Sequence, residues 1–225
     1  MRLTGPCLGA AAALVFAAQT EAQTRVPGRF LLTQYWIAHE TPGARDRSSE
    51  AIQDRHGRTL AWSCPQFVRS LSMEGTGRTW DGRLLNWDRR VNGRACFVEV
   101  DPHLYPFGVG VQGFALVPFR SLAVDPRFVP LGHTVELPEL IGMPLPDGSR
   151  HDGCFVAVDG GGAIRGHHLD LFLPGATWWR QLQASGHLAR HVTVTLDAPR
   201  CSPARRFAYR PSPFDVAGDP GDELR

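Results

Sequence analysis

The chain contains no lysine, and it has no excess of either charge. All 24 basic residues are arginine, and 22 acidic residues balance them to a net charge of +2. A balance this even gives no electrostatic reason to bind nucleic acid or an acidic membrane surface. The 225 residues also contain no internal repeat and no clear linker. This length without a visible boundary predicts one globular domain, or two at most.

Long apolar runs are missing too, apart from one at the start of the chain. Arg2 precedes a short apolar stretch, 8–18, and the residues Thr20-Glu21-Ala22 follow as a cleavage site. This order is typical of a secretory signal peptide, which we place at residues 1–22. The stretch is too short to span a bilayer as a helix. We therefore expect export to the periplasm or the medium, without stable membrane insertion.

Cysteines are few, and no two of them have the C-x-x-C spacing of a zinc site. Loss of the signal peptide removes Cys7 and leaves four cysteines. An even number in an oxidising compartment predicts two disulfides, with three connectivities open. Zinc is the competing interpretation, but the spacing disfavours it, and we expect no metal. We expect neighbours along the chain to pair, as Cys64–Cys96 and Cys154–Cys201.

Short apolar segments separated by glycine and proline turns make up the rest of the chain. Residues 176–185 and the segment after Ser63 have helical character. The remaining segments are typical of strands: 30–38, 95–100, 121–124, 134–137, 155–158, 169–172 and 191–196. Many short strands and few helices predict a mainly β fold, a small barrel within residues 23–201. We expect 40–108 to be an inserted loop region and 202–225 a mobile tail.

Three aspartates lie in the most strongly patterned stretch, residues 123–174. Asp125 precedes a proline, and Asp159 ends an apolar run before three glycines. A carboxylate at such a turn is easily solvated. Asp170 instead lies within the alternating segment 167–173, where neighbouring side chains pack on apolar surface and a charge is costly. Asp170 is therefore the aspartate that most needs a functional explanation.

The motifs around these aspartates follow one another in a characteristic order. A-V-D-P-x-x-x-P-L-G at 123–132 precedes A-x-D-x-G-G-x-I-x-G-x-x-x-D-L at 157–171. This order resembles the 3D domain, named for its three aspartates, over roughly residues 109–197. Gly160 departs from the pattern, because a threonine is usual after the second aspartate. The change removes a hydroxyl group from the site.

The 3D domain is the catalytic barrel of the membrane-bound lytic transglycosylase A family. The resemblance implies a six-stranded double-psi β-barrel without a cofactor that cleaves peptidoglycan glycan strands and leaves 1,6-anhydro ends. Such an enzyme protonates the bridging oxygen, and the C6 hydroxyl of muramic acid then closes onto the anomeric carbon. One carboxyl group can act as acid and then as base. Asp170 suits this role. Asp159 suits the role of a charged neighbour that raises the pKa of Asp170. Asp125 suits a role in ordering the loop or binding a sugar hydroxyl.

The residues expected to contact the glycan lie in the barrel motifs or in the insertion: Tyr35, Glu74, Trp80, Trp87, Gly161, Gly162 and His168. Tyr35 fits the first barrel strand of such domains. The two glycines allow a sugar to approach the main chain closely, and the tryptophans offer faces for stacking. Glu74 is a candidate for an acid in the groove, and His168 shares a strand face with Asp170.

Two other classes of function stay open. The loss of the hydroxyl at Gly160 leaves room for a glycan-binding barrel without catalysis. A glycoside hydrolase is the other alternative, with Asp159 as base for a water molecule and Asp170 as acid. In each case the expected partner is the glycan strand of peptidoglycan, bound by a monomer.

Overall fold

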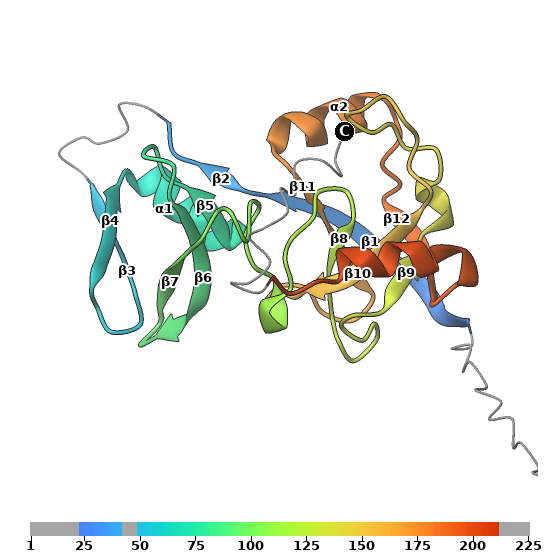
Figure 1. Ribbon diagram of the computed structural model, residues 1–225, viewed down its shortest axis with the longest axis horizontal. Coiled ribbons are helices and arrows are strands. Elements are labelled where there is room, and N and C mark those ends of the chain that lie inside the picture. The colour runs from blue at the N-terminus through green and yellow to red at the C-terminus, as the bar shows by residue number, and fades with distance from the viewer. Residues whose placement is uncertain (1–22, 42–48, 212–225) are drawn as a thin grey trace, which may run out of the picture.

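The structure is a computed structural model that describes residues 23–41 and 49–211. The expected signal peptide lies outside these residues. Figure 1 shows two lobes joined by the long strand β1 (Thr24–Trp36), which leaves the barrel lobe and continues into the second lobe as β2 (Ala38–His39). No helix in the described ranges is long and apolar enough to cross a membrane.

Six strands close into a barrel in the order β1-β11-β8-β10-β9-β12. Besides β1, they are β8 (Ser121–Val124), β9 (Thr134–Glu136), β10 (Cys154–Asp159), β11 (His168–Leu173) and β12 (His191–Leu196). The pairs β1/β11 and β8/β10 are parallel, and the other four pairs are antiparallel. The mainly β barrel predicted from the sequence is confirmed.

The strands separate two apolar clusters, one on each face. Leu169 and Leu171 belong to the cluster that fills the barrel, and helix α2 (Ala176–Ala184) adds Leu182 to it. Tyr35 and Phe172 belong to a second cluster that also includes Leu84 of the other lobe. Alternate residues of a strand point to opposite faces. His168, Asp170 and Phe172 therefore lie on the face turned away from the barrel interior.

The insertion is an ordered lobe, which corrects the expectation of a loop region. It has a sheet in the order β2-β5-β6-β7 and a hairpin of β3 and β4. Its elements are β3 (Glu50–Gln53), β4 (Thr59–Ser63), α1 (Pro65–Glu74), β5 (Thr76–Arg78), β6 (Leu84–Val91) and β7 (Arg94–Val100). Phe67, Leu71 and Phe97 belong to a buried cluster of this lobe's own. The segment 95–100 was correctly predicted as a strand and lies in β7, whereas glycines and arginines among the apolar residues hid β3 to β6 in the sequence.

Three short 3₁₀ segments complete the described chain: η1 (Val111–Gly113), η2 (Pro138–Leu140) and η3 (Pro199–Phe207). The last of them corrects the expectation of a mobile tail from residue 202. Phe207 packs against the cluster on the outer barrel face, and the carbonyl of Tyr209 accepts a hydrogen bond from Ala115 N at 2.9 Å. The tail is thus docked as far as residue 211, and Phe214 lies outside the described residues.

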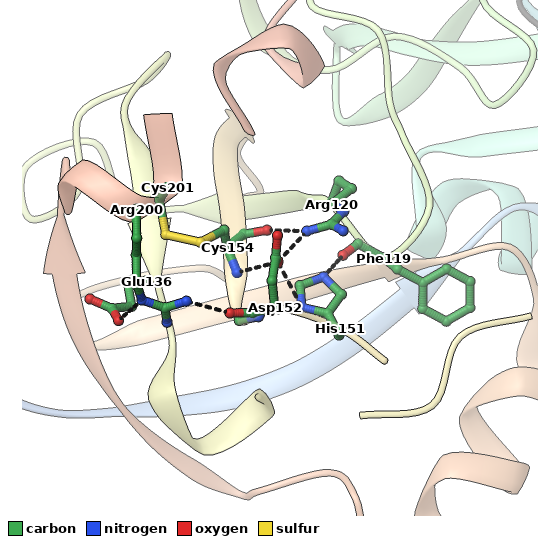
Figure 2. Close-up of polar contacts among 9 residues, drawn as sticks. Phe119, Arg120, Glu136, His151, Asp152, Cys154, Arg200 and Cys201 are labelled. Carbon is green, nitrogen blue, oxygen red and sulfur yellow. Dashed lines mark hydrogen bonds and ion pairs between the residues drawn. A yellow bond between two sulfur atoms is a disulfide. The ribbon is translucent and has the colours of Figure 1, made fainter. Parts of the chain in front are cut away.

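One disulfide, Cys154–Cys201, is present in the described chain, and it ties η3 to β10 (Figure 2). The second expected bridge is absent, since Cys64 and Cys96 are free thiols. Cys64 caps α1, where its Sγ accepts a hydrogen bond from Phe67 N at 3.5 Å. Cys96 is buried within β7. The expected pair Cys64–Cys96 was therefore wrong, and the pair Cys154–Cys201 was right.

Intact-mass analysis of the purified protein is expected to show a gain of two hydrogens on reduction, from the Cys154–Cys201 bridge. Cys64 and Cys96 should react with an alkylating reagent before reduction once the protein is unfolded. Cys201→Ser should lower the free energy of unfolding by roughly 2–4 kcal/mol, the usual contribution of a native disulfide. A gain of four hydrogens, or an unchanged stability, would contradict this arrangement.

A polar cluster next to the disulfide contains a buried neutral histidine (Figure 2). The His151 ring accepts a hydrogen bond from Gly153 N at Nδ1 and contacts the carbonyl of Phe119 through Nε2, both at 2.8 Å. Burial lowers the pKa of His151 to about 4, and the positive charge of Arg120 contributes. Protonation at Nδ1 would break the bond from Gly153, so the folded protein favours the neutral ring.

Acidification is expected to weaken the protein through His151. Because its pKa falls from 6.5 to about 4 on folding, the unfolded chain binds more protons between these values. Stability is therefore full above pH 6.5 and is lost as the pH falls toward 4, by about 3 kcal/mol in total. Urea unfolding at several pH values should show a weaker acid dependence for His151→Gln than for the unsubstituted protein. Equal pH dependence in the two proteins would refute the assignment.

Candidate active site

Strand register brings Asp159 and Asp170 to either side of one residue of β8. Asp170 of β11 and Asp159 of β10 are both paired with Ala123. A register shift between Ala157 and Asp159 makes this possible, since such an irregularity re-aims the side chain. Neighbouring strands lie about 4.8 Å apart, so the two main chains are about 10 Å apart. The charge of Asp170 contributes to the raised pKa of Asp159, so the two carboxyl groups interact electrostatically from this spacing.

Asp159 is held by hydrogen bonds to both of its carboxylate oxygens. Tyr35 donates its hydroxyl to Oδ2 at 2.8 Å, and Gly160 N donates to Oδ1 at 2.8 Å. The pKa of Asp159 is raised to about 6, chiefly by burial and in part by the charge of Asp170, while the two hydrogen bonds oppose the shift. Asp159 thus titrates close to neutral pH and responds to the charge of Asp170.

Asp170 has one bound oxygen and one without a protein partner. Thr33 donates its hydroxyl to Oδ1 at 2.7 Å. No hydrogen bond to Oδ2 is found within residues 23–41 and 49–211, and Oδ2 is not a buried unsatisfied atom. It is therefore accessible from outside. Burial raises the pKa of Asp170, whereas the Thr33 hydrogen bond and the nearby His168 lower it.

Thr33 links Asp170 to His168, which sequence reasoning had placed beside Asp170. Nε2 of His168 lies 2.8 Å from the Thr33 hydroxyl. When the Thr33 hydroxyl donates its hydrogen bond to Asp170, its oxygen is left to accept one from His168. Nε2 of His168 must then be protonated and act as the donor to Thr33. No local pattern singles out Thr33, because a threonine on a strand is ordinary. Only the parallel register, in which Thr33 is paired with Asp170, identifies it.

Glu74 reaches this group from the second lobe. It is the last residue of α1, and its Oε2 accepts a hydrogen bond from Trp36 N at 3.1 Å. Burial raises the pKa of Glu74 to about 7, and the charge of Asp170 contributes. The pKa of the buried Tyr35 is also raised well above its usual value, by burial and then by the charges of Asp159, Asp170 and Glu74. These four side chains form one electrostatic unit, which we call the carboxyl cluster.

Asp125 is buried, with 2% of its surface exposed. It forms an ion pair with Arg127 at 2.6 Å and accepts a hydrogen bond from Gly166 N at 2.8 Å. The hydrogen bonds from Arg127 and Gly166 hold the pKa of Asp125 well below its usual range. These contacts tie the β10–β11 connection to the end of β8. Asp125 thus has a structural set of contacts, whereas burial and the charges of Asp159, Asp170 and Glu74 raise the pKa of Tyr35.

The glycines of the motif lie in the exposed turn after Asp159. Gly161 and Gly162 are exposed, and a Cβ added to Gly162 would meet nothing within 4 Å. A Cβ at Gly160 would lie 3.4 Å from Val124 O, which is an ordinary contact. The turn is thus open to a ligand, and the backbone would accept the threonine that the motif usually has at this place.

The two tryptophan candidates occupy opposite ends of the β5–β6 hairpin. Trp87 is 44% exposed, and its main-chain N–H donates to the carbonyl of Gly75, the residue after Glu74. Trp80 is 62% exposed and lies in the turn beyond β5, where its N–H donates to Glu40. Trp87 is on strand β6 and not in a loop as expected. It is the one next to the carboxyl cluster.

No group of three or more histidine, cysteine or acidic side chains suited to a metal ion is found in the described part of the chain. The side chains of His167 and His168 make contacts in different places, since His167 contacts the carbonyl of Pro27 and His168 contacts Thr33.

Residues 120–196 match the 3D domain, which confirms the resemblance seen in the motifs. Among solved structures, the chain is similar to Escherichia coli MltA with bound chitohexaose, with a TM-score of 0.50 and 16% identity over 75% of this chain and 71% of that one. A membrane-bound lytic murein transglycosylase from Agrobacterium tumefaciens is similar with a TM-score of 0.46 and 14% identity, over 82% and 78% of the two chains. At this identity the first likeness supports the fold. A search of curated protein sequences finds no match.

Proposed function

We propose that this protein is a lytic transglycosylase that cleaves the β-1,4 bond between N-acetylmuramic acid and N-acetylglucosamine in peptidoglycan. The match to the 3D domain and the MltA-like fold support this proposal. The observation that carries the proposal is Asp170, which lies on the open face with Oδ2 accessible and Oδ1 fixed by Thr33. A positioned carboxyl group with one accessible oxygen is what single-residue acid–base catalysis requires.

The reaction requires Asp170 to give up one proton and then to take up another. Protonated Asp170 gives its proton to the glycosidic oxygen, the C1–O bond breaks, and N-acetylglucosamine leaves with a hydroxyl group. Asp170, now ionised, takes the proton of the C6 hydroxyl while O6 bonds to C1 of the muramic acid. The product is a 1,6-anhydro ring, and the enzyme has regained its initial protonation state without using water.

The carboxyl cluster keeps protons beside Asp170 near neutral pH, and burial raises the pKa of Asp170 itself. Like charges oppose each other's ionisation, so the cluster gives up its protons in steps that belong to the whole group. The charge of Asp170 contributes to the raised pKa values of Asp159, about 6, and Glu74, about 7. Part of the cluster thus stays protonated near pH 6–7. Tyr35 keeps Asp159 in place through its hydroxyl group.

Substrate contacts follow from the surroundings of Asp170. We assign the exposed turn at Gly161 and Gly162 to close approach of a sugar, and Trp87 to stacking from the second lobe, with Trp80 farther along the same hairpin. His168 acts through Thr33 to orient Asp170. Asp125 orders the turn and does not take part in proton transfer. Export to the cell wall compartment agrees with the Cys154–Cys201 disulfide.

Digestion of purified peptidoglycan, followed by mass analysis of the products, tests this function. Products with 1,6-anhydro ends support a transglycosylase. Reducing ends would instead identify a glycoside hydrolase, the second candidate, which the closeness of Glu74 to Asp170 favours because hydrolases of this kind use two carboxyl groups. Binding without products would identify a glycan-binding barrel.

A further inference from the structure

An open cavity of about 580 Å³ lies between β1, helix α2 and residues 188–190. Its position follows from the strand pairing. β1 is paired with β11 as far as Trp36, but with β12 only as far as Leu31. Beyond that point β12 no longer covers the edge of β1, and α2 packs nearby instead. The cavity opens along this uncovered edge.

The walls of the cavity combine aromatic, amide and cationic groups. The rings of Trp36 and Trp179 are 5.9 Å apart and inclined by 34°, and Gln34 and Gln183 also line the cavity. Arg190 is exposed, and its guanidinium group makes no hydrogen bond or ion pair with the described residues. None of the lining residues is acidic. A site of this composition suits a peptide that carries a carboxylate group.

The cavity adjoins the carboxyl cluster through β1. Thr33 lines the cavity, and its hydroxyl donates to Asp170 at 2.7 Å. Trp36 also lines the cavity, and its main-chain N–H donates to Glu74 at 3.1 Å. A ligand in the cavity is therefore separated from the residue that we assign as the acid by the width of one strand, about 5 Å.

We propose that this cavity binds the peptide attached to the muramic acid, and that Arg190 holds a carboxylate of that peptide. The inference rests on the proposed function, which places a muramic acid at Asp170. The N-acetyl sugars of the glycan are neutral, whereas the peptide brings carboxylates. Arg190 thus lets the protein distinguish glycan strands that carry peptides from strands that have lost them.

Equilibrium binding to two probes tests the proposal. The probes are short glycan fragments with their peptides and the same fragments after an amidase has removed the peptides. Binding is measured with the full Asp170→Asn chain, so that turnover does not interfere. We expect the peptide-bearing fragments to bind roughly three- to tenfold more tightly, the range expected for a charge-assisted contact at an exposed site. Arg190→Gln should abolish this preference and leave the affinity for peptide-free fragments unchanged.

Arg180→Gln is the matched control, because Arg180 is an exposed residue of α2 that does not line the cavity. It should keep the preference. The proposal would be overturned if the protein that keeps Arg190 bound both probes with equal affinity. An unchanged preference in Arg190→Gln would also overturn it. Failure of the proposed function would appear separately, as a peptidoglycan digest without anhydro products, because the binding comparison requires no cleavage.

Discussion

Asp170→Asn is expected to remove nearly all glycan cleavage while the protein stays folded and still binds glycan. The amide has almost the same shape, but it can neither deliver nor accept the proton. General acid–base catalysis contributes roughly 10²–10⁴-fold, and we expect the upper end because one group acts in both steps. Release of anhydro-muropeptides from purified peptidoglycan measures the loss.

The comparison requires proof that the variant is folded. Circular dichroism and the melting temperature should match those of the unsubstituted protein. Thr33→Val is a useful companion, since it removes the hydrogen bond to Oδ1 and keeps the carboxyl group. It should lower the rate less than Asp170→Asn does. If folded Asp170→Asn still cleaved at a near-normal rate, the acid would be elsewhere, and Glu74 would be the next residue to replace.

Asp159→Asn is expected to cut the rate and to narrow the pH range of activity from the alkaline side. The activity is lost as the pH rises through the pKa of the acid, because the acid must be protonated. Removing the negative charge of Asp159 takes away a repulsion that opposes ionisation of Asp170, so the pKa of Asp170 falls. The alkaline limb of the pH profile should therefore move to lower pH, and the deficit should be greater at pH 7 than at pH 5.

Tyr35→Phe is the matched control for this shift, because it removes the hydrogen bond to Asp159 and keeps the charge. Since that bond lowers the pKa of Asp159, its loss should raise this pKa and leave the alkaline limb where it was or slightly lower, by less than in Asp159→Asn. The pH dependence of kcat/KM for the two variants and the parent is the measurement. An Asp159→Asn profile with an unmoved alkaline limb would show that the two aspartates do not share their titration.

Local sequence patterns predicted the barrel strands well and the second lobe poorly. The segment 191–196 alternates cleanly and is strand β12. The segment around β6 carries Asp88, Arg89 and Arg90, because it pairs with β7 over a partly exposed surface. Charges on an exposed strand give the same composition as a loop, so the sequence could not separate the two.

The candidate site was also predicted only in part, because local sequence patterns reveal some of its residues and not others. Asp170 stood out because a carboxylate in an alternating apolar strand is costly, and that argument needs only its neighbours in the chain. Thr33 and Trp36 gave no such signal. Thr33 meets Asp170 across 137 residues, and Trp36 meets Glu74 across 38. The residues that flank Thr33 and Trp36 in the chain give no indication of these hydrogen-bond partners.

By itself, the sequence determined which side chains share a strand face, since the two-residue period of a strand follows from covalent geometry. It also determined the motif that identifies the 3D domain. Only the tertiary structure decided which carboxyl groups interact and which cysteines are bonded. Asp159, Asp170 and Glu74 influence one another through space and through shared burial, and Cys154 meets Cys201 because folding brings their Cα atoms to 5.3 Å. Charge coupling and disulfide geometry depend on distances between atoms, and the order of residues along the chain does not contain these distances.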